Sequence, residues 1–153
     1  MKTLLALLTI SFLATGGAIA DDAKPAASVT GNYKGHVKGA EGDVRMALLQ
    51  EGDLVHGRIH AQVDGKGIRG LILGRREKDR VILWILAGDD LVFDFRLVGD
   101  NLNGHFIDGW PDENKDGILT FEEARAHFDK EKTRQLLEEV EYSKVSFTRE
   151  RNE

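Results

Sequence analysis

A twelve-residue segment beginning at Asp112 reads D-E-N-K-D-G-I-L-T-F-E-E and places oxygen donors where they can meet around one cation. Asp112, Asn114 and Asp116 lie two residues apart, so a tightly coiled loop brings their side chains to one centre, and Gly117 permits the sharp turn. Glu123 can add both oxygens of its carboxylate, a reach that suits Ca²⁺ better than Mg²⁺. The candidate metal ligands are Asp112, Asn114, Asp116, Ile118 through its backbone carbonyl, Thr120 directly or through water, and Glu123.

This segment resembles an EF-hand calcium loop, with donors at loop positions 1, 3, 5, 7, 9 and 12 and glycine at position 6. The resemblance covers the loop and the helix that follows it. Upstream the sequence departs from the family, because Gly109 and Pro111 disfavour a helix at Trp110, so a strand is expected to enter the loop. The alternative is an acidic turn that merely caps a helix.

The loop has no second copy in the sequence, although EF-hand loops usually stabilise one another in pairs. We therefore expect modest affinity, in the range of about 10⁻⁴ to 10⁻³ M that extracellular modules show. A calcium sensor needs two helices that open, and the entering helix is missing. The expected role of calcium is structural.

Short runs of alternating apolar and polar residues from Val29 to Asp108, separated by Gly and Asp, are typical of antiparallel strands joined by tight turns. A further alternating run ends at Arg149. The predicted strands cover 29–38, 43–51, 54–63, 67–77, 80–87, 91–98, 101–108 and 142–149. The predicted fold class is mainly β: an eight-stranded antiparallel up-and-down β-barrel with the EF-hand-like loop and a helix inserted before the last strand.

Two strands carry the same pattern, G-D-x-apolar-x-G-basic-apolar, at 52–59 and 99–106. Each copy has a glycine inside its strand, which permits either a sharp bend or the close approach of another backbone. With these two copies of one strand pattern, the chain resembles lipocalin-like and avidin-like small barrels. That resemblance implies a barrel that carries a small apolar ligand.

The inserted segment, 109–141, contains the loop and a helical stretch over 120–141 that begins with a capping box, Thr120 and Glu123. We expect an interruption at 131–135, with one apolar face formed by Phe121, Ala124 and Phe128 and another by Leu136 and Val140. The strand at 81–86 is apolar on both faces, so the helix is expected to cover its outer side. The alternative is an exposed patch for a partner protein.

The first twenty residues have the features of a signal peptide: Lys2, an apolar run, and small residues ending in A-I-A at Ala20. A disordered leader at 21–28 and a single domain at 29–149 would follow. No later stretch is long and apolar enough for a transmembrane helix, and the destination is the periplasm or the medium. The chain has no Cys and therefore no disulfides. Its net charge of −5 makes nucleic acid an unsuitable partner.

Catalytic chemistry finds little support in the sequence. Ser28, Ser143 and Ser146 lie outside any nucleophile-elbow context, and the carboxylates fall in turns. We therefore expect no enzyme, no catalytic residue and no cofactor other than Ca²⁺. His36, His56, His60 and His105 are expected to face solvent, and Tyr33, Trp84, Trp110, Phe93 and Phe95 to line or fill the barrel.

The predicted function is that of an exported calcium-binding barrel carrying a small apolar ligand. The alternatives are a protein-interaction or inhibitor module that uses the barrel rim or helix surface, and an unrecognised hydrolase. An open cavity lined by Trp84, Phe93 and Phe95 would favour the ligand carrier, whereas a filled interior with an apolar surface patch would favour the interaction module.

Overall fold

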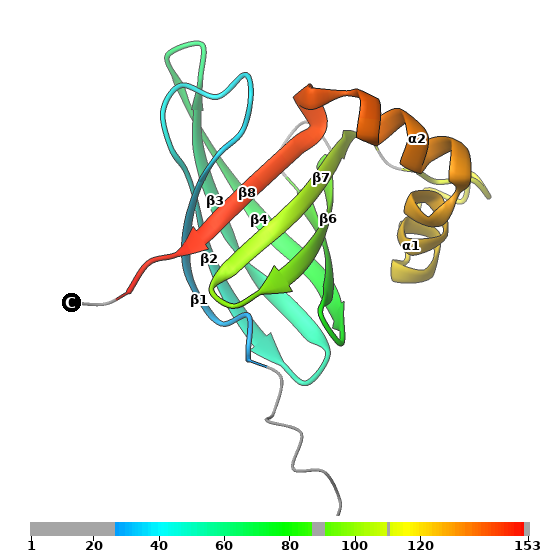
Figure 1. Ribbon diagram of the computed structural model, residues 1–153, viewed down its shortest axis with the longest axis horizontal. Coiled ribbons are helices and arrows are strands. Elements are labelled where there is room, and N and C mark those ends of the chain that lie inside the picture. The colour runs from blue at the N-terminus through cyan, green and yellow to red at the C-terminus, as the bar shows by residue number, and fades with distance from the viewer. Residues whose placement is uncertain (1–26, 87–90, 110, 152–153) are drawn as a thin grey trace, which may run out of the picture.

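The computed structural model describes residues 27–86, 91–109 and 111–151, and shows a closed barrel with two helices packed against one side of its wall (Figure 1). Each strand pairs with its sequence neighbour, and the last pairs with the first, so the predicted up-and-down barrel is confirmed. The strands are β1 (Gly31–His36), β2 (Val44–Glu51), β3 (Leu54–Val63), β4 (Lys66–Glu77), β5 (Arg80–Leu86), β6 (Leu91–Val98), β7 (Asn101–Asp108) and β8 (Lys144–Arg149).

Strand boundaries agree with the predicted ones to within two residues, because the turn residues define them. Asp64 and Gly65, at the tip of the β3–β4 hairpin, both have positive φ, 50° and 70°. Such a pair of left-handed residues matches the twist of the flanking strands. The side-chain alternation then directs one set of residues inward along each strand.

The two glycines of the repeated pattern lie where neighbouring backbones come very close. A Cβ added to Gly57 would come within 2.0 Å of the carbonyl oxygen of Ala47, and one added to Gly104 within 1.9 Å of that of Asp94. Of the two roles expected for these glycines, close backbone approach is the one that applies.

Apolar side chains fill the barrel. Phe93 stacks on Phe95 with ring centroids 5.3 Å apart, and Phe147 meets Phe95 edge-on at 5.8 Å. At the end of the barrel where the chain enters, Val29 and Tyr33 are fully buried, and the guanidinium of Arg149 lies over the Tyr33 ring, 5.4 Å from its centroid. This end is therefore closed.

The inserted segment forms α1 (Phe121–Asp129), α2 (Glu131–Glu139) and a 3₁₀ turn, η1 (Glu141–Ser143). The capping box of Thr120 and Glu123 is present, as predicted. The interruption comes at Lys130, one residue before the predicted region. This break changes the rotation of α2 about its axis, so the prediction for its apolar face was wrong: Leu137 is buried, and Leu136 is 59% exposed.

Helix α1 covers the outer face of β5 and β6, as the apolar run at 81–86 predicted. Phe121, Ala124 and Phe128 pack with Ile82 and Val92 in a second hydrophobic cluster outside the barrel. The alternate residues of β5, Val81, Leu83 and Ile85, face the interior. The apolar character of both faces of β5 is thereby explained.

The signal-peptide segment, 1–20, and most of the predicted leader lie outside the described residues. The last two leader residues contact the barrel, since Arg76 donates to the carbonyl of Ala27 and Arg149 to that of Ser28. Among the described residues, the helices are too short or too polar for a membrane span.

Candidate metal centre

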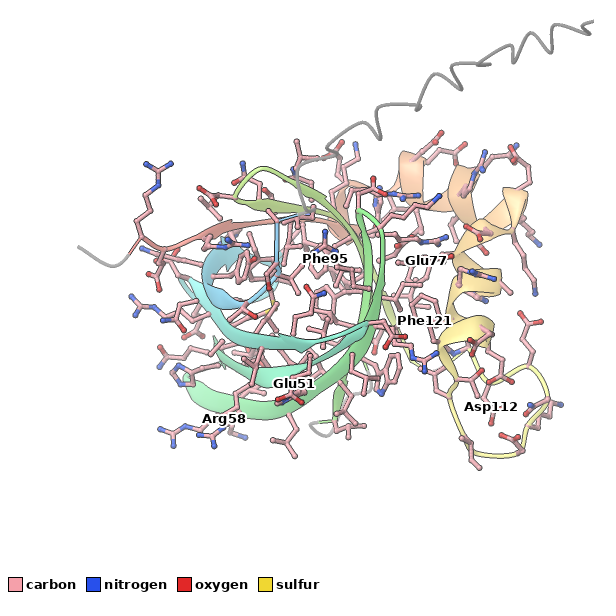
Figure 2. All side chains as sticks on the ribbon, turned by 90° about the horizontal axis from the view of Figure 1, so that it is seen from below. Glu51, Arg58, Glu77, Phe95, Asp112 and Phe121 are labelled. Atoms are coloured by element: carbon pink, nitrogen blue, oxygen red, sulfur yellow. The ribbon has the colours of Figure 1, made fainter. Side chains whose placement is uncertain are left out.

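The predicted calcium loop, 112–123, lies between the end of β7 and the first turn of α1, and a strand enters it, as predicted. Figure 2 shows Asp112 on this loop, beside α1 and outside the barrel. Gly109, with φ of 91°, follows β7 and turns the chain out of the wall. In the sequence, the loop therefore links the barrel to the helical layer.

Hydrogen bonds inside the loop curl it around its acidic side chains. The carboxylate of Asp112 accepts from the backbone N–H of Gly117 at 2.8 Å, the amide oxygen of Asn114 from Asp116 at 2.9 Å, and the carboxylate of Asp116 from Ile118 at 2.8 Å. Gly117 has φ of 79°, the left-handed conformation expected for loop position 6. The first three candidate ligands therefore belong to one tightly wound turn.

One oxygen of this loop has no partner in the protein. Asp112 uses Oδ2 for Gly117, whereas its Oδ1 is buried and accepts no hydrogen bond from the described residues. A buried carboxylate oxygen without a donor costs free energy unless a cation or water satisfies it.

Glu123 serves the helix cap in this structure. Its Oε2 accepts from the backbone N–H of Thr120 at 3.0 Å and from its hydroxyl at 2.8 Å. Within the described part of the chain, no three His, Cys, Asp or Glu side chains form a group that could hold a metal ion. The expected ligand set also draws on an amide, a carbonyl and a hydroxyl, from Asn114, Ile118 and Thr120.

The loop is also tied to the junction between α1 and α2. Glu113 forms an ion pair with Lys130, and its Oε1 lies 3.5 Å from Nδ1 of His127. The hydrogen bond from Lys130 lowers the pKa of Glu113, whose side chain is exposed. This contact between the loop and the helices was not evident from the sequence.

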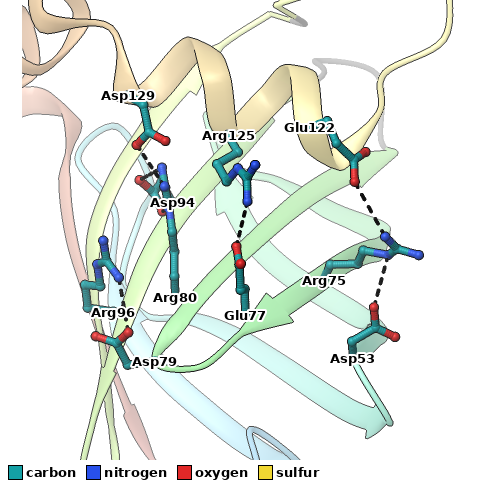
Figure 3. A network of polar contacts seen from close by, with 10 residues as sticks. All are labelled: Asp53, Arg75, Glu77, Asp79, Arg80, Asp94, Arg96, Glu122, Arg125 and Asp129. Carbon is teal, nitrogen blue, oxygen red and sulfur yellow. Dashed lines mark hydrogen bonds and ion pairs between the residues drawn. The ribbon is translucent and has the colours of Figure 1, made fainter.

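Helix α1 is attached to the barrel by three ion pairs at helical spacing (Figure 3). Glu122 lies 3.7 Å from Arg75, Arg125 lies 2.9 Å from Glu77, and Asp129 lies 2.8 Å from Arg80. Residues 122, 125 and 129 share one helix face, so each turn of α1 meets the next charge along β4 and β5. The three ion pairs fix the position of α1 along the wall.

Arg80 is the buried member of this set. It donates from Nε and Nη2 to the two carboxylate oxygens of Asp94, at 2.9 and 3.0 Å, and from Nη1 to Asp129. Arg80 is 7% exposed, so these bonds form largely out of water. Such a forked arrangement holds both partners in a fixed geometry.

The far end of the barrel contains an apolar cavity of about 220 Å³, lined among others by Val44, Ile59, Ala61, Ile85, Phe93 and Phe106. Phe95 is buried in the core and does not line this cavity. The prediction that Trp84 lines or fills the barrel was wrong, because Trp84 packs against the outer cluster under α1. Trp110 lies outside the described residues.

The exposed histidines His36, His56 and His60 confirm the solvent-facing prediction, whereas His105 contradicts it. Its Nδ1 lies 3.2 Å from the hydroxyl of Ser143, because η1 packs over β7. Burial, with help from nearby Lys144, lowers the pKa of His105. The Ser143 hydroxyl donates to the carbonyl of Val140 at 2.9 Å, so its proton does not point to the imidazole.

Neither a family model, nor a curated protein, nor a solved structure matches this chain.

Proposed function

We propose that this protein is an exported calcium-binding β-barrel in which the ion clamps the helical layer onto the barrel wall. Asp112, Asn114, Asp116, Ile118, Thr120 and Glu123 would hold the ion. Calcium would supply the positive charge that neutralises the loop carboxylates. The proposal is supported chiefly by the buried, unpartnered Oδ1 of Asp112 in a loop already wound around its oxygen donors.

The clamp follows from what the loop adjoins. Thr120 caps α1, and Phe121 starts the helix face that is buried against β5 and β6. Glu113 ties the same loop to the end of α1 through Lys130. An ion that orders the loop therefore favours the docked position of α1, and docking in turn lowers the cost of ordering the loop.

Calorimetric titrations with Ca²⁺ and Mg²⁺, followed by thermal unfolding with and without calcium, test this function. One calcium per chain should bind, more tightly than Mg²⁺, with a dissociation constant of about 10⁻⁴ to 10⁻³ M. At free calcium 100 times that constant, the added stability should be about 2.7 kcal/mol. Absence of calcium binding overturns the site, and binding without a change in thermal midpoint overturns the clamp.

A second candidate function rests on the cavity at the open end of the barrel. We propose that it holds a small apolar ligand, or part of one, since its volume of about 220 Å³ lies below that of most drug-sized sites. The neutral dye N-phenyl-1-naphthylamine is a suitable probe. Its fluorescence should rise on binding to the protein and stay low with Ala61→Phe, which fills the cavity. Ala47→Phe, on the outer face of β2, is the matched control. Equal dye binding by Ala61→Phe and the parent would remove this candidate.

A further inference from the structure

Basic side chains lie side by side on the outer wall of β2, β3 and β4. Arg45 is directly opposite His60, which is directly opposite Arg69, so the three form one row across neighbouring strands. Arg58 lies in the next row, opposite Leu71. We call Arg45, Arg58, His60 and Arg69 the basic face. In Figure 2, Arg58 points away from the barrel on wall that the helices leave uncovered.

The arginines of the basic face differ from the rest in having no partner. Arg45, Arg58 and Arg69 make no hydrogen bond or ion pair with any residue that the structure describes. The other arginines all do, namely Arg75, Arg76, Arg80, Arg96, Arg125, Arg134, Arg149 and Arg151. Like charges grouped on adjacent strands destabilise a sheet, and this chain carries an excess of carboxylates that could have neutralised them.

Exposed leucines continue the basic face. Leu71 and Leu86 are paired with each other in the row of Arg58 and are 59% and 40% exposed, and Leu49 and Leu73 in the following row are each 43% exposed. A shallow trough of about 720 Å³ runs between the arginines and the first two leucines. Glu150 borders the trough beside β1. The surface thus joins positive charge to apolar area.

We propose that this face binds the surface of a membrane containing anionic phospholipids. Guanidinium groups bind phosphate oxygens in a bidentate manner, and leucines beside them can enter the boundary between headgroups and acyl chains. An acidic protein is the competing partner. Hot spots of protein interfaces are enriched in Trp and Tyr as well as Arg and are poor in Leu, whereas this face combines its arginines and histidine with exposed leucines. The net charge of −5 repels an anionic surface elsewhere on the molecule, so the basic face also sets the orientation.

Co-sedimentation with vesicles tests the proposal, using the chain from Asp21 so that the apolar segment at 1–20 cannot insert. One set of vesicles contains phosphatidylcholine alone and the other equal parts of phosphatidylcholine and phosphatidylglycerol. The parent should bind only the anionic vesicles, at low salt. Each arginine near an anionic surface contributes about fivefold in binding, so the triple variant Arg45→Gln, Arg58→Gln, Arg69→Gln should bind about 100-fold more weakly.

The matched control removes the same charge from Arg96, Arg134 and Arg151, which are exposed and lie outside the face. This control should bind anionic vesicles at least ten times more tightly than the triple variant of the basic face. Leu71→Ser should weaken binding while leaving its salt dependence unchanged. Equal thermal midpoints exclude misfolding as the cause, and parallel runs with calcium and with chelator exclude bridging by the ion. No binding to anionic vesicles, or equal loss in both triple variants, overturns the proposal and favours an acidic protein partner.

Discussion

Asp94 and Asp129 bind the same guanidinium, that of Arg80, from two layers of the molecule: Asp94 from the barrel wall and Asp129 from the end of α1. The side chain of Asp94 is 21% exposed and that of Asp129 is 54% exposed. One buried cation therefore joins two layers of the molecule. The two carboxylates should contribute differently to stability, because water competes more strongly for the more exposed Asp129.

Asp94→Asn should lower the free energy of unfolding by about 2 to 3 kcal/mol, since it weakens charge-assisted bonds to a buried arginine. Asp129→Asn should cost no more than about 1 kcal/mol, the usual range for an exposed partner. Urea unfolding of both variants measures the difference. Equal costs would contradict the claim that solvent exposure decides how much each carboxylate contributes.

Glu123→Gln should weaken calcium binding by about tenfold or more, or about 1.4 kcal/mol. Glutamine can still complete the capping box with Thr120, so the start of α1 is preserved while the charged ligand is lost. Calorimetric titration gives the affinity. Glu113→Gln, at a non-ligand position of the loop, keeps an oxygen that can accept from Lys130, so it is the control and should bind calcium nearly as well as the parent. Unchanged affinity in Glu123→Gln would contradict the ligand assignment.

Phe128→Ala should both destabilise the protein and weaken calcium binding, because helix docking and loop ordering belong to one equilibrium. Phe128 is 3% exposed, and truncation of a buried phenylalanine costs about 3 to 5 kcal/mol. Leu136→Ala, at an exposed position on α2, should change stability by less than about 0.5 kcal/mol. If Phe128→Ala were less stable but bound calcium like the parent, helix docking and calcium binding would not be coupled.

His105 should make the fold less stable in mild acid. Its pKa in the folded protein is below the ordinary value of 6.5, so the unfolded chain takes up the proton first as the pH falls. The stability from neutral His105 is present above pH 6.5 and is lost as the pH falls toward the folded pKa. Urea unfolding between pH 7.5 and 5.5, at saturating calcium, should show a smaller slope for His105→Gln. An unchanged slope in His105→Gln would contradict this account.

Local signals in the sequence were sufficient for the barrel and for the buried face of α1. Alternation gave the strands, turn residues such as Asp64 and Gly65 gave their ends, and the spacing of Phe121, Ala124 and Phe128 gave the covering face. These features depend on residues close together in the chain. The site ligands were predicted in the same way, and their convergence on an ion remains a prediction.

Features that depend on distant residues could not be predicted. Arg80 was predicted only as the first residue of the strand at 80–87, because its partner Asp129 comes from another layer, 49 positions later. The exposure of His105 was wrong for the same reason, since η1 covers it from outside its strand. The basic face required the register of three strands, which brings Arg45 and Arg69 into one row.

The seam between β1 and β8 makes this barrel slow to close relative to its parts. Every other strand pair through β7 is a hairpin whose residues are near in sequence, whereas the seam pairs Gly35 with Phe147, 147 − 35 = 112 positions apart. The helical layer forms part of the segment that joins β7 to β8. While its helices are not docked, this long segment raises the entropic cost of closing the barrel. Docking of α1 on β5 and β6 would shorten that segment if it came before the arrival of β8, and the insertion would then guide the last strand as well as cover the wall.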